Sequence, residues 1–174
     1  MHKHIIFLFF LSISFYNLFP LELTDGYKDI KLGMSKEEVS NLLKKSFEFD
    51  AKREEVLSIR LEPDTEIITA KGFGFINVGY FHFNKDKLFQ IFIKLNEKKI
   101  DYYALLKNNT NKYGNPKTLD PERAIWENSK TKIVIEKPAT IKYLFLPVWN
   151  ELIKKDHSTD DLNLEMRNKF LENL

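Results

Sequence analysis

Histidine is the residue type in this sequence best suited to acid–base catalysis or metal binding. It occurs four times, as His2, His4, His82 and His157, and the chain has no cysteine. A transition-metal site needs several nitrogen, sulfur or carboxylate ligands brought together, and this spacing suggests no such group. We therefore predict no metal and no cofactor. His82 is expected to be a half-exposed histidine of a β-strand, surrounded by aromatic residues.

Acidic residues near the C-terminus raise the question of a calcium loop. Asp156, Asp160, Asp161 and Glu165 lie close together in the sequence. Their spacing differs from that of an EF-hand, which also needs a glycine at its turn. Capping of a helix N-terminus by Thr159 or Asp160 explains the cluster better.

Nucleophilic and phosphate-binding patterns are equally weak. Ser35 has no evident histidine and acid partners for a nucleophilic role. Gly72-Phe73-Gly74 lacks the further glycines and the Lys-Ser/Thr pair of a phosphate-binding loop. Any two carboxylates can meet in a folded chain, but no pair stands out. The sequence predicts no catalytic residue, and we expect that the protein is not an enzyme.

The composition describes a folded domain with a balanced charge. The chain has 174 residues, of which 43% are hydrophobic and 30% charged, with a net charge of +2. Removing residues 1–23 takes away one basic and one acidic residue, Lys3 and Glu22, so the net charge does not change. A nucleic-acid-binding protein usually has a clustered basic face, so we expect no nucleic-acid partner. The absence of cysteine excludes disulfides and the lipid-modified cysteine of a bacterial lipoprotein.

The N-terminal segment, residues 1–23, is typical of an export signal. Met1-His2-Lys3-His4 precedes an unbroken apolar run over residues 5–11, and apolar residues dominate as far as Leu23. Cleavage after the small residues of Ser12-Ile13-Ser14 or nearer Leu23 would release a periplasmic protein. If neither position is used, residues 5–23 are just long enough to anchor the chain in a bilayer. We expect a bacterial protein of the periplasm or cell envelope, or one anchored in the inner membrane and facing the periplasm.

Two helix starts share the same capping chemistry. Ser35 is a good N-cap, with Glu38 at the third helical position to complete a capping box. Asp101, 66 residues later, is the N-cap of a second helix that Gly114 and Pro116 should end. Trp149, Leu152 and Ile153 suggest a short turn or helix after Pro147, followed by a polar break over residues 154–159. Beyond the break, Leu162 begins an amphipathic helix that runs to Leu174, because apolar residues recur there at every fourth position.

Alternating apolar and polar residues predict strands after each helix start. The first group covers residues 55–61, 66–73, 78–83 and 88–95. Its last two members form a hairpin around a four-residue polar loop, residues 84–87, with Phe89, Ile91, Ile93 and Leu95 on one face. The second group covers residues 124–127, 133–136 and 141–146.

The fold class that follows is α+β, with short helices packed on antiparallel sheet. The order of helix then strands occurs twice, which predicts a tandem of two similar units. We divide the chain into the signal or anchor over residues 1–23, unit one over residues 24–98, unit two over residues 99–148 and a helical tail over residues 149–174.

Two segments are rich enough in apolar residues to serve either the core or a docking surface. Residues 143–149 combine aromatic and aliphatic side chains, and either form a core strand with a packed tryptophan or a docking surface. The tail either packs on its own sheet or binds a partner or membrane surface. The predicted partner-binding residues are Tyr143, Phe145, Trp149, Leu162, Met166 and Phe170.

The Gly33-Met34-Ser35-x-x-Glu38-Val39 segment resembles the first helix of small exported proteins of the BamE/SmpA-OmlA type. It is also similar to the helix-strand modules of the β-lactamase-inhibitor-protein-like fold. The aromatic strand over residues 80–83 and the helix end at Gly114-Asn115-Pro116, followed by Trp126, fit the same scheme. The resemblance implies a helix packed on antiparallel sheet and a binding or assembly role in the cell envelope. BamE-type proteins are lipid-anchored through an N-terminal cysteine, which this chain lacks.

We therefore expect an exported envelope protein that acts by protein–protein interaction, including a role in outer-membrane assembly or maintenance. One alternative is an inner-membrane-anchored accessory protein that touches the membrane through residues 5–23. Another is a periplasmic protein that binds a small ligand or lipid.

Overall fold

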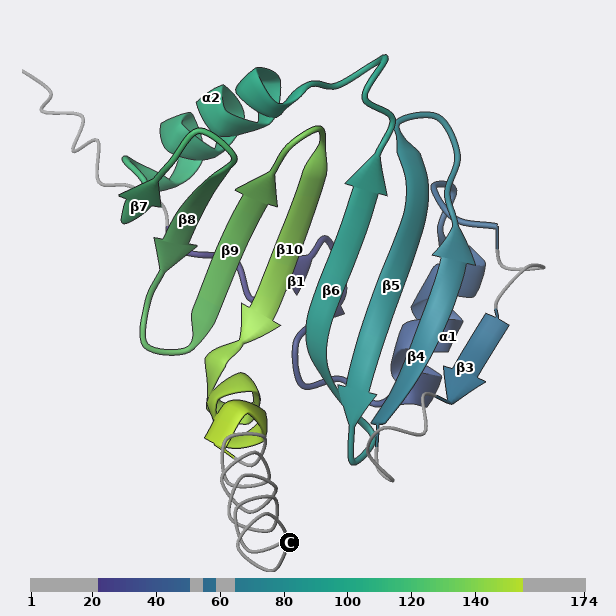
Figure 1. The fold of residues 1–174 in the computed structure, drawn as a ribbon. Helices are drawn as coiled ribbons and strands as arrows, with labels where there is room; N and C mark the ends of the chain where they lie inside the picture. Colours follow the sequence, from purple (N-terminus) through teal and green to yellow (C-terminus); the bar gives the residue numbers. More distant parts are fainter. Residues whose placement is uncertain (1–21, 51–54, 59–64, 155–174) are drawn as a thin grey trace, which may run out of the picture.

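The computed structural model describes residues 22–50, 55–58 and 65–154, and these form an α+β fold (Figure 1). The helices are α1 (Lys36–Lys45), α2 (Tyr102–Tyr113) and a third helix over residues 146–154. The strands are β1 (Gly26–Tyr27), β2 (Ile30–Lys31), β3 (Glu55–Ser58), β4 (Thr65–Lys71), β5 (Ile76–Asn84), β6 (Lys87–Leu95), β7 (Thr118–Leu119), β8 (Arg123–Glu127), β9 (Thr131–Glu136) and β10 (Thr140–Phe145). The predicted fold class is confirmed.

Eight strands form one antiparallel sheet in the order β3-β4-β5-β6-β10-β9-β8-β7. Each half of this sheet is a run of four neighbouring strands that follows one helix, α1 or α2. The two runs meet at their last strands, because β10 pairs with β6 in antiparallel register from Thr140↔Lys94 to Leu144↔Gln90. The predicted tandem of helix-then-strands units is therefore one continuous sheet.

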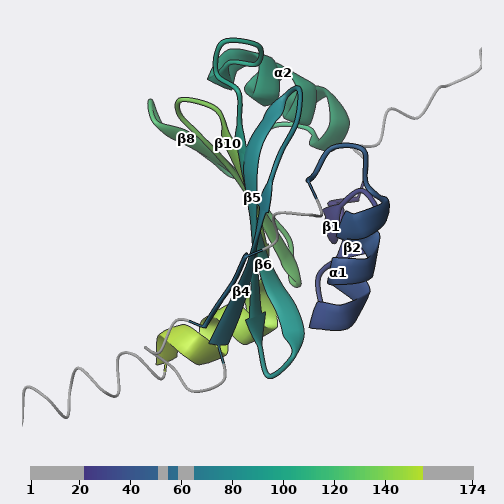
Figure 2. The same ribbon diagram turned by 90° about the vertical axis from the view of Figure 1, so that its right-hand side faces the viewer.

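The two helices and the small β1-β2 ribbon cover the same face of the sheet (Figure 2). The third helix leaves β10 on the opposite side, at one end of the sheet. None of the helices in the part of the chain that the structure describes is long and apolar enough to cross a membrane. Most of the predicted membrane segment, residues 5–23, lies outside that part.

The main core lies between the helices and the sheet. Val39 and Leu43 of α1 and Tyr102 and Tyr113 of α2 pack on alternate residues of the strands. The largest fully buried strand side chains on this face are Phe81, Phe83, Ile68, Leu88, Ile91, Ile93, Ile133 and Ile135. Alternation along each strand sends these residues to the helix side and leaves the intervening residues on the other face.

Local capping explains where both helices begin. The Ser35 hydroxyl accepts a hydrogen bond from the backbone N–H of Glu38, and the Glu38 carboxylate accepts one from the backbone N–H of Ser35 at 2.8 Å. The Asp101 carboxylate accepts from the backbone N–H of Ala104 at 2.7 Å. Each cap satisfies an amide that the helix cannot satisfy internally. Both predicted N-caps are confirmed.

The end of α2 fixes the position of the next strands. Gly114 ends the helix with φ +79° and ψ −169°, a conformation that glycine tolerates and other residues avoid. Its carbonyl accepts a hydrogen bond of 2.8 Å from the indole nitrogen of Trp126 in β8. The helix end is thus tied to the sheet through a buried tryptophan.

The β5–β6 hairpin differs from its prediction in two details. The strands extend to Asn84 and Lys87, so the turn has two residues, Lys85 and Asp86, both with positive φ. The register shifts between His82 and Phe83, which leaves Phe89 as an extra residue in β6. Phe89 lies outside the helix-side core and its ring contacts His82. It does not share a face with Ile91, as the alternation alone predicted.

Candidate functional site

The face of the eight-stranded sheet that lies opposite α1 and α2 is here called the open face (Figure 1). One row of directly opposed residues crosses six strands of this face. It runs through Thr69, Tyr80, Phe92, Lys142, Val134 and Ile125. Six strands span roughly 24 Å, so this row is an extended surface rather than a cleft.

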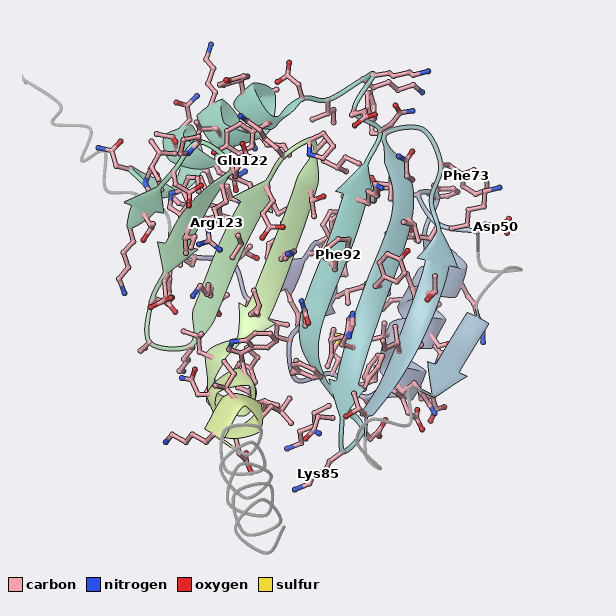
Figure 3. All side chains as sticks on the ribbon, in the orientation of Figure 1. Asp50, Phe73, Lys85, Phe92, Glu122 and Arg123 are labelled. Atoms are coloured by element: carbon pink, nitrogen blue, oxygen red, sulfur yellow. The ribbon has the colours of Figure 1, made fainter. Side chains whose placement is uncertain are left out.

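The centre of the row is an aromatic pair with a cation beside it. The rings of Tyr80 and Phe92 meet edge to face, with centroids 5.5 Å apart. The ammonium of Lys142 lies 5.3 Å from the Phe92 ring centroid. Figure 3 shows Phe92 projecting from the middle of the sheet on this face. Both rings are half-buried, so they keep area available for contact with another molecule.

Paired charges flank the aromatic centre. Lys142 forms an ion pair with Glu136 at 2.6 Å. Glu127 pairs with Lys117 at 2.8 Å and with Lys132 at 3.1 Å. The hydrogen bond from Lys117, followed by that from Lys132, lowers the pKa of the Glu127 carboxyl below its usual value despite partial burial. The open face therefore has an apolar centre and a rim of charges that are already compensated.

A second row of the open face contains His82. It runs through Ile67, His82, Gln90, Leu144 and Lys132. Ile67 and Leu144 are buried, and the Phe89 ring stands edge on to the imidazole at 6.2 Å between centroids. Burial among these groups disfavours the imidazolium and lowers the pKa of His82.

We expect the substitution His82→Gln to reduce the loss of stability between pH 7 and pH 5. Above the unfolded-state pKa of about 6.5, both the folded and the unfolded chain hold His82 neutral. As the pH falls through that value, the unfolded chain binds the proton first, so the free energy of unfolding of the wild-type protein decreases. Glutamine does not titrate. Urea denaturation at a series of pH values measures the difference.

The low-pH limb provides the internal control for that experiment. Glu127 and Glu38 have lowered pKa values in the folded chain. The free energy of unfolding of the wild-type protein and of the His82→Gln variant should therefore decrease in parallel below pH ~4.5. Parallel curves from pH 7 to pH 5 would show that burial does not shift the titration of His82.

The predicted partner-binding residues lie in three different settings. Tyr143 is 7% exposed and belongs to the helix-side core, where burial raises the pKa of its phenol. At this position the core alternative is the one that the structure supports, and a partner cannot reach the ring. Phe145 and Trp149 are half-buried. Leu162, Met166 and Phe170 lie outside the described residues.

The open-face residues were not among the predicted site residues. Tyr80, Phe92 and Ile125 stand at the polar-side positions of their strands, where single apolar residues are common. Only the pairing register places them in one row. The sequence does show that Tyr80 and Phe92 alternate with core residues along their strands. The strand order was needed to show that the two side chains are neighbours.

Within residues 22–50, 55–58 and 65–154, no three histidine or carboxylate side chains are close enough to hold a metal ion. The residues paired with His82 on its two neighbouring strands are Ile67 and Gln90, and its ring also contacts Phe89. The geometry of this face is suited to binding through shape and apolar contact.

These features define a class of protein: an α+β domain with two helices on one face of an eight-stranded antiparallel sheet and an accessible opposite face. Residues 25–155 match the family model described as the TP0088 domain. Because this match covers most of the chain, the protein belongs to the TP0088 domain family. No curated protein and no solved structure matches the chain.

Proposed function

We propose that the protein is an exported, non-catalytic binding protein of the bacterial cell envelope that holds a protein partner against its open face. The observation that carries this proposal is the row across six strands, in which the aromatic pair Tyr80 and Phe92 and the side chain of Ile125 are half-buried and keep exposed apolar area. Protein interfaces combine such an apolar centre with a polar rim, and aromatic residues supply much of their binding energy.

The paired rim charges support the same proposal. Lys142 and Glu127 already have partners of opposite charge, Glu136 and Lys132. Burying a charge that has no partner costs free energy. A protein that covers these ion pairs avoids that cost, because each charge keeps its partner. The sheet itself is rigid, because each of its inner strands is hydrogen-bonded on both sides. A rigid surface loses little conformational entropy on binding.

The location in the envelope rests on the sequence of residues 1–23, which is typical of an export signal. The resemblance of the α1 start to BamE-type proteins favours outer-membrane assembly or maintenance as the setting. An uncleaved N-terminal segment would instead make this an accessory protein anchored in the inner membrane, with the same open face directed to the periplasm.

Site-specific photo-crosslinking in the native cells tests the proposed surface. We expect a crosslinking amino acid in place of Phe92 or Ile125 to give one discrete adduct with another protein. The same amino acid in place of Tyr103, which is 68% exposed on α2, should not give this adduct. In a Phe92→Glu variant, the adduct formed from position 125 should be lost while the circular dichroism spectrum is unchanged.

The same samples test the location. A processed N-terminus in the envelope fraction supports export, and an intact Met1 in the inner-membrane fraction supports the anchored alternative. Recovery in the cytoplasm contradicts both. An identical adduct from positions 92 and 103, or no adduct from the open face, would contradict the proposed binding surface.

A further inference from the structure

Three phenylalanine side chains are exposed at one end of the sheet. Phe47 is 98% exposed, Phe73 53% and Phe75 59%. Phe47 follows α1, and the other two lie in the turn between β4 and β5. We call this group the aromatic corner. Exposed large apolar groups gathered at one place usually mark a binding site.

Backbone hydrogen bonds hold the segments of the aromatic corner together. The Phe73 N–H donates to the carbonyl of Glu48 at 2.8 Å, and the Asn96 N–H donates to the carbonyl of Phe75 at 2.8 Å. Phe49 and Gly72 form an isolated β-bridge in the same place. Figure 3 shows Phe73 beside Asp50 at this end of β4 and β5. The three rings thus come from adjacent, mutually bonded segments.

The core does not need these three rings. Phe49, two residues after Phe47, is 3% exposed and packs edge to face on Phe81 at 5.8 Å. Ile76, directly after Phe75, is also buried. These neighbours fill the core beneath the corner. Phe47 itself lines a cleft of about 410 Å³, together with Tyr27 and Leu42.

Lysines surround the aromatic corner. Its three segments, residues 44–50, 71–75 and 96–99, contain five exposed lysines and three acids. The lysines are Lys44, Lys45, Lys71, Lys98 and Lys99, and the acids are Glu48, Asp50 and Glu97. The Lys99 ammonium lies 5.7 Å from the Phe75 ring centroid.

Glu48 is compensated by a lysine outside these three segments. The Glu48 carboxylate pairs with Lys28 at 2.7 Å and accepts a hydrogen bond from the Tyr27 hydroxyl at 2.8 Å. This contact raises the pKa of Tyr27, after the larger effect of burial. Within these three segments the lysines are therefore in excess over the acids.

We propose that the aromatic corner inserts its three rings into the surface of an anionic lipid bilayer. Aromatic side chains are favoured at the level of the lipid headgroups, and lysines beside them are attracted to anionic lipids. Lysine is depleted in protein–protein interfaces, so its abundance here favours a membrane over a protein partner. The corner shares no residue with the open face.

The absence of cysteine from the chain allows a direct test of this contact. A single cysteine introduced as Phe47→Cys in the full chain carries a polarity-sensitive NBD label. We expect its emission to shift to the blue, and a lipid-linked quencher to reduce it, on addition of phosphatidylcholine vesicles that contain phosphatidylglycerol. Vesicles of phosphatidylcholine alone should give a much smaller change, and high salt should weaken the response. The label reports its own position, whatever the N-terminal segment does.

Leu119→Cys provides the matched control. Leu119 is 60% exposed and lies in the wall of another cleft with Asp120 and Lys137. The two lysines near it, Lys117 and Lys137, form ion pairs with Glu127 and Glu122, so this apolar position has no excess of lysines. Its label should not respond to either kind of vesicle. The label can also be placed at Phe75→Cys, with Phe47→Ser and Phe73→Ser as additional changes. Each ring removed should raise the vesicle concentration that gives half of the full response by about tenfold.

Three results would overturn the proposal. They are an unchanged spectrum at position 47, equal responses at positions 47 and 119, and equal insertion into vesicles with and without phosphatidylglycerol. Both rings are exposed and contribute little to the core, so the serine variants should keep the fold. Circular dichroism checks this.

Discussion

Phe81→Ala is expected to lower the free energy of unfolding by about 3–5 kcal/mol, because it removes a whole ring from a filled core. Phe81 is completely buried on β5, near the middle of the sheet, and contacts the Phe49 ring edge to face. A loss of this size is a large part of the roughly 5–15 kcal/mol that stabilises an ordinary domain. Urea denaturation followed by circular dichroism measures it.

Phe73→Ala makes the same chemical change at an exposed position and serves as the control. Phe73 is 53% exposed, so its removal should alter the free energy of unfolding by no more than about 0.5 kcal/mol. Equal destabilisation by the two substitutions would mean that the turn carrying Phe73 is part of the folded core. It would also weaken the argument that this ring is available to a membrane.

Gly72→Ala should destabilise the protein by about 1–3 kcal/mol through overpacking. A Cβ atom on Gly72 would lie 2.6 Å from the carbonyl oxygen of Ile76 and 2.4 Å from its Cγ2. The Gly72 N–H also donates to the Asn77 carbonyl at 2.9 Å. To make room for the Cβ atom, the backbone at Gly72 and the backbone at Ile76 have to move apart in the turn that connects β4 to β5. Differential scanning calorimetry or urea denaturation detects the change.

Gly74, two residues further on, provides the comparison for Gly72→Ala. Its φ is +65°, and a Cβ atom there would have no other atom within 4 Å. Asparagine tolerates this left-handed conformation better than most residues. Gly74→Asn should therefore cost less than about 1 kcal/mol. If it proves more damaging than Gly72→Ala, backbone conformation rather than crowding controls this turn.

Local chemistry explains which parts of the fold could be predicted from the sequence. A cap needs only the residues next to it, so Ser35 and Asp101 identified both helix starts. Strands with clear alternation of apolar and polar residues, such as β6 and β9, could be predicted equally well. β1 and β7 were not predicted, because two residues are too short to show a period.

Long-range pairing accounts for most of what could not be predicted. Nothing near β6 indicates that its neighbour is β10, which lies 44 residues further along the chain. The extra residue at Phe89 turns one ring to the opposite face, and no local pattern shows such a shift of register. The open face depends on both features, so its residues could be recognised only from the structure.

The aromatic corner was hidden for a different reason. Phenylalanine is usually buried, so Phe47, Phe73 and Phe75 read as core residues beside their buried neighbours. Their exposure became evident only in the structure, where the segments that carry Phe47 and Phe73 meet at the β-bridge between Phe49 and Gly72. A pattern of residue types cannot distinguish a ring that fills the core from one that points away from it.

The junction of β6 and β10 has a consequence for how the chain assembles. Neighbouring strands within each half are joined by short connections, whereas this junction closes a segment of 44 residues. The entropy cost of closing a loop increases with its length, and contacts distant in sequence form slowly. Each half can therefore gather its own strands early, and the junction completes the structure last. Until it does, β6 and β10 are bare strand edges, and in this interval the chain is most exposed to pairing with another copy of itself.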